Sequence, residues 1–169
     1  MRTHVAIVGS GFSGLGAAMR LKQEGFSDLV ILERADDVGG TWRDNRYPGC
    51  ACDVASHLYS LSFAPNPDWT DRYSGQQEIW RYLQKCADDF GLRPHLRFEH
   101  EVRSAVWDEN ARRWRIETSR GPLTANVFVI AAGALSEPVV PDIPGLASFE
   151  GHTFHSARWD HTFGLEGRR

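Results

Sequence analysis

The chain has 169 residues, of which 41% are hydrophobic and 24% charged, and its formal net charge is −3. This composition suits a globular protein with one good core, and the weak negative charge gives no reason to expect nucleic acid or a membrane as a partner. The longest apolar run, residues 127–135, is too short to span a bilayer, and we expect no signal peptide before the first strand.

The cysteines and histidines indicate neither a disulfide framework nor a metal site. Cys50, Cys52 and Cys86 cannot all pair, and C-x-C is not the C-x-x-C redox spacing. We therefore expect reduced thiols in a cytoplasmic protein. No group of Cys and His residues has zinc-binding spacing, so the sequence predicts no metal.

The N-terminal stretch carries the strongest signal. Four apolar residues, 5–8, lead into a G-x-G-x-x-G motif at residues 9–14. The apolar run is short and β-branched, which indicates a buried parallel strand, and residues 11–24 have helical periodicity up to Gly25. Strand, glycine-rich turn and helix in this order are typical of a dinucleotide-binding βαβ unit.

Each glycine of the motif has its own physical reason. Gly9 allows a tight turn, Gly11 lets the backbone approach a pyrophosphate, and Gly14 lets helix and strand pack closely. A second apolar strand, residues 29–32, ends in Glu33, where a carboxylate accepts hydrogen bonds from ribose hydroxyls and repels a 2′-phosphate. The predicted ligand is therefore FAD or NAD rather than NADP; the alternative is an ordinary βαβ unit with a fortuitous glycine turn.

The middle of the chain predicts a long loop and a helix. Residues 41–53 are rich in Trp, Tyr, Pro, Gly and Cys and have no helix or strand period, so we expect a functional loop. A helix is predicted over residues 76–90, begun by a capping box of Ser74 and Gln77 and ended by Gly91.

Alternating patterns then predict strands. Three stretches indicate an antiparallel three-stranded β-meander inserted at about residues 96–126, namely 97–106, 114–118 and 123–125. The apolar run 127–132 indicates a further parallel strand that stops at Gly133. The predicted fold class is α/β, a Rossmann-like domain with a parallel sheet flanked by helices and this inserted meander.

Two longer motifs carry a resemblance to a known family. Residues 39–53 match G-G-x-W-x4-[FY]-P-G-x3-D, and residues 149–160 match F-x-G-x3-H-x3-W-[PD] at every specified position. Both motifs, in this order, resemble the signatures of flavin-dependent Baeyer–Villiger monooxygenases, and the resemblance covers essentially the whole chain. The related N-hydroxylating and mammalian-type flavin monooxygenases usually have Tyr or Phe where this chain has Trp159.

The resemblance implies a domain organisation and a reaction. Residues 1–145 would be the FAD-binding domain and residues 146–169 a linker, with the NADPH domain absent because the chain ends where the family's second glycine motif would begin. The full-length enzyme would use FAD, NADPH and O2 to oxidise a small organic ketone to an ester or lactone through a peroxyflavin. This chain alone is expected to be inactive. An N- or S-oxygenating flavin monooxygenase and a non-catalytic dinucleotide-binding module remain as alternatives.

The motifs and the resemblance together name the candidate cofactor-binding residues. They are Gly9, Gly11, Phe12, Ser13, Gly14, Glu33, Arg34, Gly40, Thr41, Trp42, Tyr47, Cys52, Asp53, Val54, Tyr59, Val102, Ala131, Ala132 and Gly133. Trp42 and Tyr47 would lie against the isoalloxazine region, or would be ordinary packing aromatics.

Asp53 is the one candidate catalytic residue, in a supporting role. In the family the matching aspartate helps to hold an Arg of the NADPH domain, whereas an ordinary loop aspartate would bond nearby backbone. The resemblance assigns a further set to the linker, where structural or domain-coupling work is expected rather than acid–base chemistry: Phe149, Gly151, His155, Trp159 and Asp160.

Overall fold

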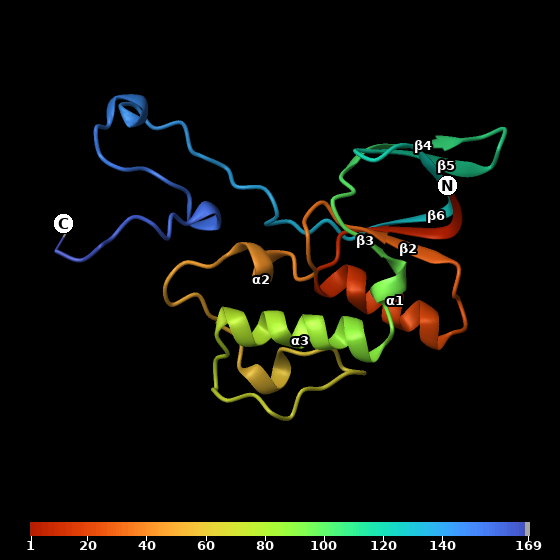
Figure 1. Ribbon diagram of the computed structural model, residues 1–169, viewed down its shortest axis with the longest axis horizontal. Helices are drawn as coiled ribbons and strands as arrows, with labels where there is room; N and C mark the ends of the chain where they lie inside the picture. Colours follow the sequence, from red (N-terminus) through yellow and green to blue (C-terminus); the bar gives the residue numbers. More distant parts are fainter. Residues whose placement is uncertain (168–169) are drawn as a thin grey trace.

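The computed structural model describes residues 1–167, which form a six-stranded sheet with helices and a long C-terminal segment (Figure 1). The strand order is β3-β2-β1-β6-β5-β4. The mutually parallel strands are β1 (Arg2–Val8), β2 (Leu29–Leu32), β3 (Leu96–Arg97) and β6 (Leu123–Ile130). The antiparallel strands are β4 (Val102–Asp108) and β5 (Arg113–Thr118). The predicted α/β class with an antiparallel part is confirmed.

Helices cover one face of the parallel strands, and the antiparallel strands lie toward the other (Figure 1). The α-helices of the described chain are α1 (Phe12–Gln23), α2 (Thr41–Asp44) and α3 (Gln76–Asp89). Side chains of successive strand residues point to opposite faces, so Val5 and Ile7 pack in the cluster that holds α1 and α3. Ala6 packs instead with Val30 and Ile116. Burial on both faces explains why residues 5–8 of β1 and all of β2 are uninterrupted apolar runs.

The predicted first strand of the meander is two separate strands. Residues 96–97 form β3, which pairs in parallel with β2, and the meander begins only at Val102. Between them the chain turns through Glu99, whose φ is +57°. The backbone N–H of His100 donates to the carbonyl of Glu33 at 2.8 Å, which ties this turn to the end of β2.

The last two predicted strands, residues 123–125 and 127–132, are in turn one strand, β6. Its first part pairs with β5, and nearly its whole length pairs with β1. The change from alternating to continuous apolar character therefore marks the point where pairing with β5 stops.

The helices agree with the predictions apart from details at their ends. α1 ends before Gly25, whose φ is +88°, and α3 ends before Gly91, whose φ is +59°. The capping box expected at the start of α3 does not form, because Gly75 is the N-cap and the hydroxyls of Ser74 and Ser56 bond each other at 2.7 Å. The predicted loop 41–53 begins with the short helix α2.

Short 3₁₀ helices mark the remaining turns: η1 (Ser56–Leu58), η2 (Arg93–His95), η3 (Leu146–Ser148) and η4 (Ser156–Arg158). The last two belong to the segment that leads away from the sheet after β6, drawn in blue in Figure 1. The final two residues of the predicted linker, 168 and 169, lie outside the described residues.

Candidate functional site

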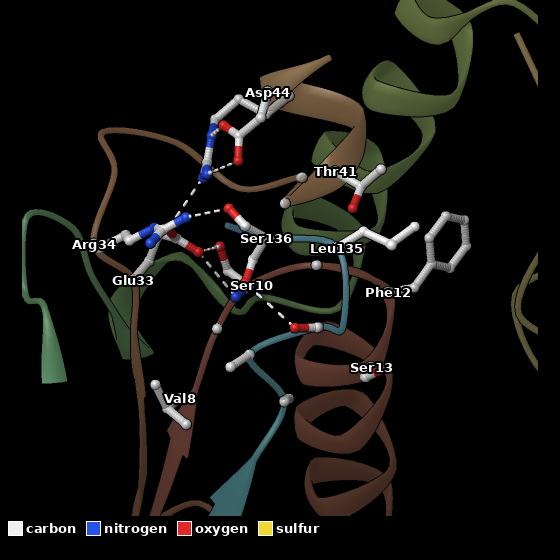
Figure 2. A pocket seen from close by; sticks show the side chains of 18 of the residues that line it. Val8, Ser10, Phe12, Ser13, Glu33, Arg34, Thr41, Asp44, Leu135 and Ser136 are labelled. Carbon is white, nitrogen blue, oxygen red and sulfur yellow. Dashed lines mark hydrogen bonds and ion pairs between the residues drawn. The ribbon is translucent and has the colours of Figure 1, made fainter. Parts of the chain in front are cut away.

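A cavity of about 550 Å³ opens at the carboxyl ends of β1, β2 and β6. In open α/β sheets this edge is where ligands bind. The loops after the three strands and the start of α2 line it, and Figure 2 shows their side chains converging on it. The lining includes most of the predicted cofactor-binding residues: Gly9, Gly11, Phe12, Ser13, Glu33, Arg34, Gly40, Thr41, Trp42, Tyr59, Val102, Ala131, Ala132 and Gly133.

Two glycines of the motif are required by the space around them. Gly9 has a φ of +95°, and a Cβ there would overlap the carbonyl group of Ala131. A Cβ on Gly14 would overlap the carbonyl oxygen of Gly9 and lie 2.9 Å from its carbonyl carbon. Gly14 does not line the cavity; it lets the first turn of α1 sit directly on the end of β1.

The N-terminus of α1 faces the cavity and is open. Gly11 is the N-cap and has no side chain to occupy the space, and a Cβ there would meet only the Cα of Gly40, at 3.8 Å. The first turn of α1, which lies wholly within the described chain, contains no acidic residue. Because the first N–H groups of a helix lack partners within it and carry the positive end of its dipole, this end suits an anion.

Glu33 lies on the other side of the glycine-rich turn, and the residue is only 4% exposed. Its Oε2 accepts hydrogen bonds from the backbone N–H of Ser10 at 3.0 Å and from the Ser10 hydroxyl at 2.6 Å. Its Oε1 accepts from the backbone N–H of Ala35 at 3.0 Å and pairs with Nη1 of Arg43 at 3.1 Å. The carboxylate thus ties β2 to the turn after β1, as Figure 2 shows.

Arg43, on α2, is the buried cation beside this carboxylate. Its Nη1 also donates to the carbonyl of Asp37 at 2.6 Å, and its Nε and Nη2 donate to the two carboxylate oxygens of Asp44 at 2.8 and 3.1 Å. Burial opposes the charged form of Arg43, but the bond to Asp44 and the charges of Glu33 and Asp44 outweigh it and raise its pKa. The guanidinium therefore stays charged and fixed in position.

Aromatic side chains form a further wall of the cavity. The indole N–H of Trp42 donates to the hydroxyl of Tyr59 at 3.0 Å, and the two rings meet edge to face. The ring of Phe12 lies 5.1 Å from that of Tyr59. Burial raises the pKa of Tyr59, so its hydroxyl remains protonated. These three rings give one side of the cavity an aromatic wall.

Comparisons with known proteins agree with this geometry. A family model described as an NAD(P)-binding Rossmann-like domain matches residues 7–84. The chain is 65% identical to a Baeyer–Villiger monooxygenase of Streptomyces coelicolor, over 98% of this chain and 32% of that protein. It is 48% identical to a Baeyer–Villiger monooxygenase of Pseudomonas aeruginosa, with the same coverage. The homologues of this chain are Baeyer–Villiger monooxygenases.

Solved monooxygenase structures share the fold. An oxidised steroid monooxygenase bound to NADP is 42% identical, with a TM-score of 0.84 over 96% of this chain and 32% of that one. The structure of OTEMO in complex with FAD and NADP is 34% identical, with a TM-score of 0.85 over 98% of this chain and 32% of that one. The chain therefore spans about a third of the length of the monooxygenases that it matches.

The rest of the first Baeyer–Villiger signature lies outside the cavity lining. Tyr47 is half-buried, and its hydrogen bond with Cys50 raises its pKa. Cys52 is buried in the core, where its Sγ accepts from the backbone N–H of Val54 at 3.4 Å. Asp53 and Val54 are exposed. Asp53, the candidate catalytic residue, is therefore not among the residues that line the cavity, although its charge contributes to the raised pKa of Tyr59, which does line it.

The second Baeyer–Villiger signature forms a small structure of its own in the C-terminal segment. The carboxylate of Asp160 accepts from the hydroxyl of Thr162 at 2.6 Å and pairs with Nε2 of His152 at 2.8 Å. The bonds from Thr162, and then the one from His152, lower the pKa of Asp160. The Nδ1 of His155 accepts from a backbone N–H inside η4 at 3.0 Å, and Trp159 stacks edge to face on Phe154. Phe149 is exposed, and its ring lies against Gly151.

Sequence reasoning missed several residues that line the cavity. Ser10 occupies an unspecified position of the glycine motif at residues 9–14, and Arg43 occupies one of the motif at residues 39–53. Neither motif could therefore identify them. The others are the strand-end residues Val8 and Leu32, Gly39 and Asp44 beside and within α2, and the loop residues His100, Glu101, Leu135, Ser136 and Glu137. Ser136 and Glu137 are both bonded to Arg34, a predicted residue that follows Glu33 in the sequence. The guanidinium of Arg34 donates to the carbonyl of Ser136 at 2.7 Å and pairs with the carboxylate of Glu137.

Two further observations bear on other classes of site. Within residues 1–167, no helix is long and apolar enough to cross a membrane. No group of three or more His, Cys, Asp or Glu side chains in that part of the chain is placed to hold a metal ion.

Proposed function

We propose that this chain is the FAD-binding part of a Baeyer–Villiger monooxygenase that uses NADPH and O2 to convert a small organic ketone into an ester or lactone. The observation that carries the proposal is the cavity at the carboxyl edge of the parallel strands, which is lined by both an open helix N-terminus and a buried carboxylate. The relatives support the same assignment, and one solved neighbour holds both FAD and NADP. The activity would belong to a protein longer than this chain.

The residues present fit the adenosine diphosphate half of FAD. The backbone N–H groups of Phe12 and Ser13 would bind the diphosphate, because they lie in the open first turn of α1. The carboxylate of Glu33 would accept a hydrogen bond from a ribose hydroxyl. A volume of about 550 Å³ is in the range of ordinary ligand pockets. When bound, the flavin supplies the redox chemistry that activates O2.

The chain's own residues would bind, orient and shield the cofactor. Trp42 and Tyr59 would exclude water, and Arg34 would hold the loop after β6 across the site through its bond to Ser136. We assign Asp53 to contact with parts of the longer protein, since it is exposed outside the cavity.

The domain organisation belongs to the same proposal. Residues 1–145 would be the FAD domain and residues 146–169 a linker to an NADPH domain. A cytoplasmic location rests on the cysteines, which are free thiols.

The proposal is tested by titrating the purified chain separately with FAD, NAD⁺ and NADP⁺ and by following ligand fluorescence and thermal melting. We expect FAD to bind and to raise the melting temperature more than either nicotinamide dinucleotide. Glu33→Gln should weaken FAD binding by about tenfold or more, because a charged acceptor is lost. Preferential binding of NADP⁺, or no binding of FAD at concentrations near 1 mM, would contradict the assignment.

A second arm tests the reaction itself. A protein that carries this chain as its N-terminal part should convert a cyclic ketone to a lactone in the presence of NADPH and O2, as measured by product analysis. Oxidation of an amine or a sulfide without any lactone formation would favour the N- or S-oxygenating alternative instead.

A further inference from the structure

Arg43 and Glu33 form a buried ion pair in the wall of the cavity. Each side chain is about 5% exposed, and Nη1 of Arg43 lies 3.1 Å from Oε1 of Glu33. A cation at this position has no evident use in binding an adenosine, because its donors point into the protein, to Asp37 and Asp44. Burying two charges is unfavourable unless their geometry and remaining hydrogen bonds are well satisfied. The pair therefore calls for a reason.

The hydrogen bonds of the Glu33 carboxylate indicate what the ion pair does. An ionised carboxylate offers about four lone-pair sites, and the structure directs four donors at them: the N–H and hydroxyl of Ser10, the N–H of Ala35 and the guanidinium of Arg43. A ribose hydroxyl can bond this carboxylate only if one of the four donors gives way.

The four donors are not equally free to move. Two are backbone N–H groups, fixed by the turn after β1 and by the end of β2. The guanidinium of Arg43 is fixed because it bonds Asp37 and both carboxylate oxygens of Asp44. The hydroxyl of Ser10 is the exception, since it rotates about its C–O bond. It is the donor that a ribose hydroxyl can replace.

We propose that Arg43 is a positioning residue of the adenosine subsite, an inference that rests on the proposed function. Arg43 and the backbone N–H of Ala35 together anchor Oε1 of Glu33 and so set the plane of the carboxylate, which leaves Oε2 to exchange the Ser10 hydroxyl for a ribose hydroxyl. Without Arg43, only the backbone N–H of Ala35 would hold Oε1, and the carboxylate would be freer to turn away from the ribose position. The diphosphate would still bind at α1, but recognition of the ribose would be lost.

The test compares ADP with 2′,3′-dideoxy-ADP, which lacks both ribose hydroxyls of the adenosine. Both are titrated calorimetrically into the full 169-residue chain. Wild-type chain should prefer ADP by about tenfold or more, since a hydrogen bond to a charged acceptor is lost with the dideoxy ligand. In Arg43→Met this preference should fall below about threefold. Arg81→Met, which removes an equal charge from the exposed side of α3, should keep the wild-type preference.

The preference ratio separates positioning from general structure. If Arg43 were merely structural, Arg43→Met would weaken both ligands equally and leave the ratio unchanged, and that result overturns the proposal. If Arg43→Met does not fold, Arg43→Lys gives the readout: it keeps the charge but not the planar fork, so an intermediate ratio is expected, and an unchanged ratio again overturns the proposal.

The failure of this inference is distinguishable from failure of the proposed function. A wild-type chain that binds FAD and ADP but does not prefer ADP over the dideoxy ligand retains its function and refutes the role of Arg43. A wild-type chain that binds neither FAD nor ADP refutes both.

Discussion

The cavity and the C-terminal segment are held together by contacts of opposite range. In the cavity, several bonds join residues far apart in the chain, as between Arg34 and Ser136 and between Ser10 and Glu33. In residues 149–163, bonds join near neighbours, as between His152 and Asp160. Because of these long-range contacts, the shape of the cavity depends on the fold of the whole domain. The C-terminal segment is instead held by bonds between its own residues. Substitutions in the first region should therefore affect global stability, and those in the second should act locally.

Gly14→Ala should give the largest effect. The added Cβ would overlap the backbone carbonyl oxygen of Gly9. A backbone group cannot move aside as a side chain can. We expect a loss of about 3 kcal/mol or more in the free energy of unfolding, measured by denaturant unfolding. Gly164→Ala is the control in the C-terminal segment, where a Cβ would meet nothing within 4 Å. Equal free energies of unfolding for the two variants would contradict the difference between the cavity and the C-terminal segment.

Arg43→Met should come next. The substitution leaves the carboxylates of Glu33 and Asp44 buried or half-buried without their cation. Removing one partner of a buried pair destabilises proteins by about 3 kcal/mol, and the same unfolding assay measures it. The double variant Glu33→Gln/Arg43→Met should recover part of this loss, because no unpaired charge remains at Glu33. Additive losses would show that the two side chains do not act together.

Ser10→Ala should have a smaller effect, which lowers stability without weakening binding. The loss of one hydrogen bond to Glu33 should lower the free energy of unfolding by about 1 kcal/mol. The affinity for ADP should not fall, because the lone pair of Oε2 becomes free for the ribose. A drop of more than about fivefold in ADP affinity would mean that the Ser10 hydroxyl does not exchange with the ligand.

Asp160 should give the smallest and most local effect. Hydrogen bonds from Thr162, and then from His152, lower its pKa below the usual value of 3.8. A group with a depressed pKa in the folded state stabilises that state above its unfolded pKa, and the stabilisation is lost as the pH falls through the folded pKa. NMR titration should thus show residues 152–162 loosening below pH 3.8 while the sheet is unchanged. Titration of Asp160 above that value would contradict the structure.

Much of the fold could be predicted because it follows from local patterns. The apolar runs of β1 and β2, the glycine-rich turn and the stripe of α3 each follow from residues adjacent in sequence. The predicted boundaries of strands and helices were wrong where contacts between distant parts of the chain decide them. Residues 123–130 change pattern within one strand because β5 pairs with only the first part. Ser74 has capping spacing but bonds Ser56, a residue brought close by the loop before α3.

The candidate site divides in the same way. Glu33 follows from its distance to the glycine motif, and the structure places it at the cavity. The position of Arg43 in the site could not be predicted, because it is set by two carboxylates and a backbone carbonyl that meet only in the folded chain. Asp53 matches its motif but is exposed and does not line the cavity, so its predicted supporting role stays a prediction.

The most direct test of the central claim is the stoichiometry of FAD binding by the purified chain, followed by flavin absorbance. The long-range contacts of the cavity predict that the chain builds its own site and binds one FAD per chain, with a shifted flavin spectrum that is lost in Gly14→Ala. A wild-type chain that is folded but leaves FAD unbound would contradict the claim, because the cavity would then need the rest of a longer protein to bind its cofactor.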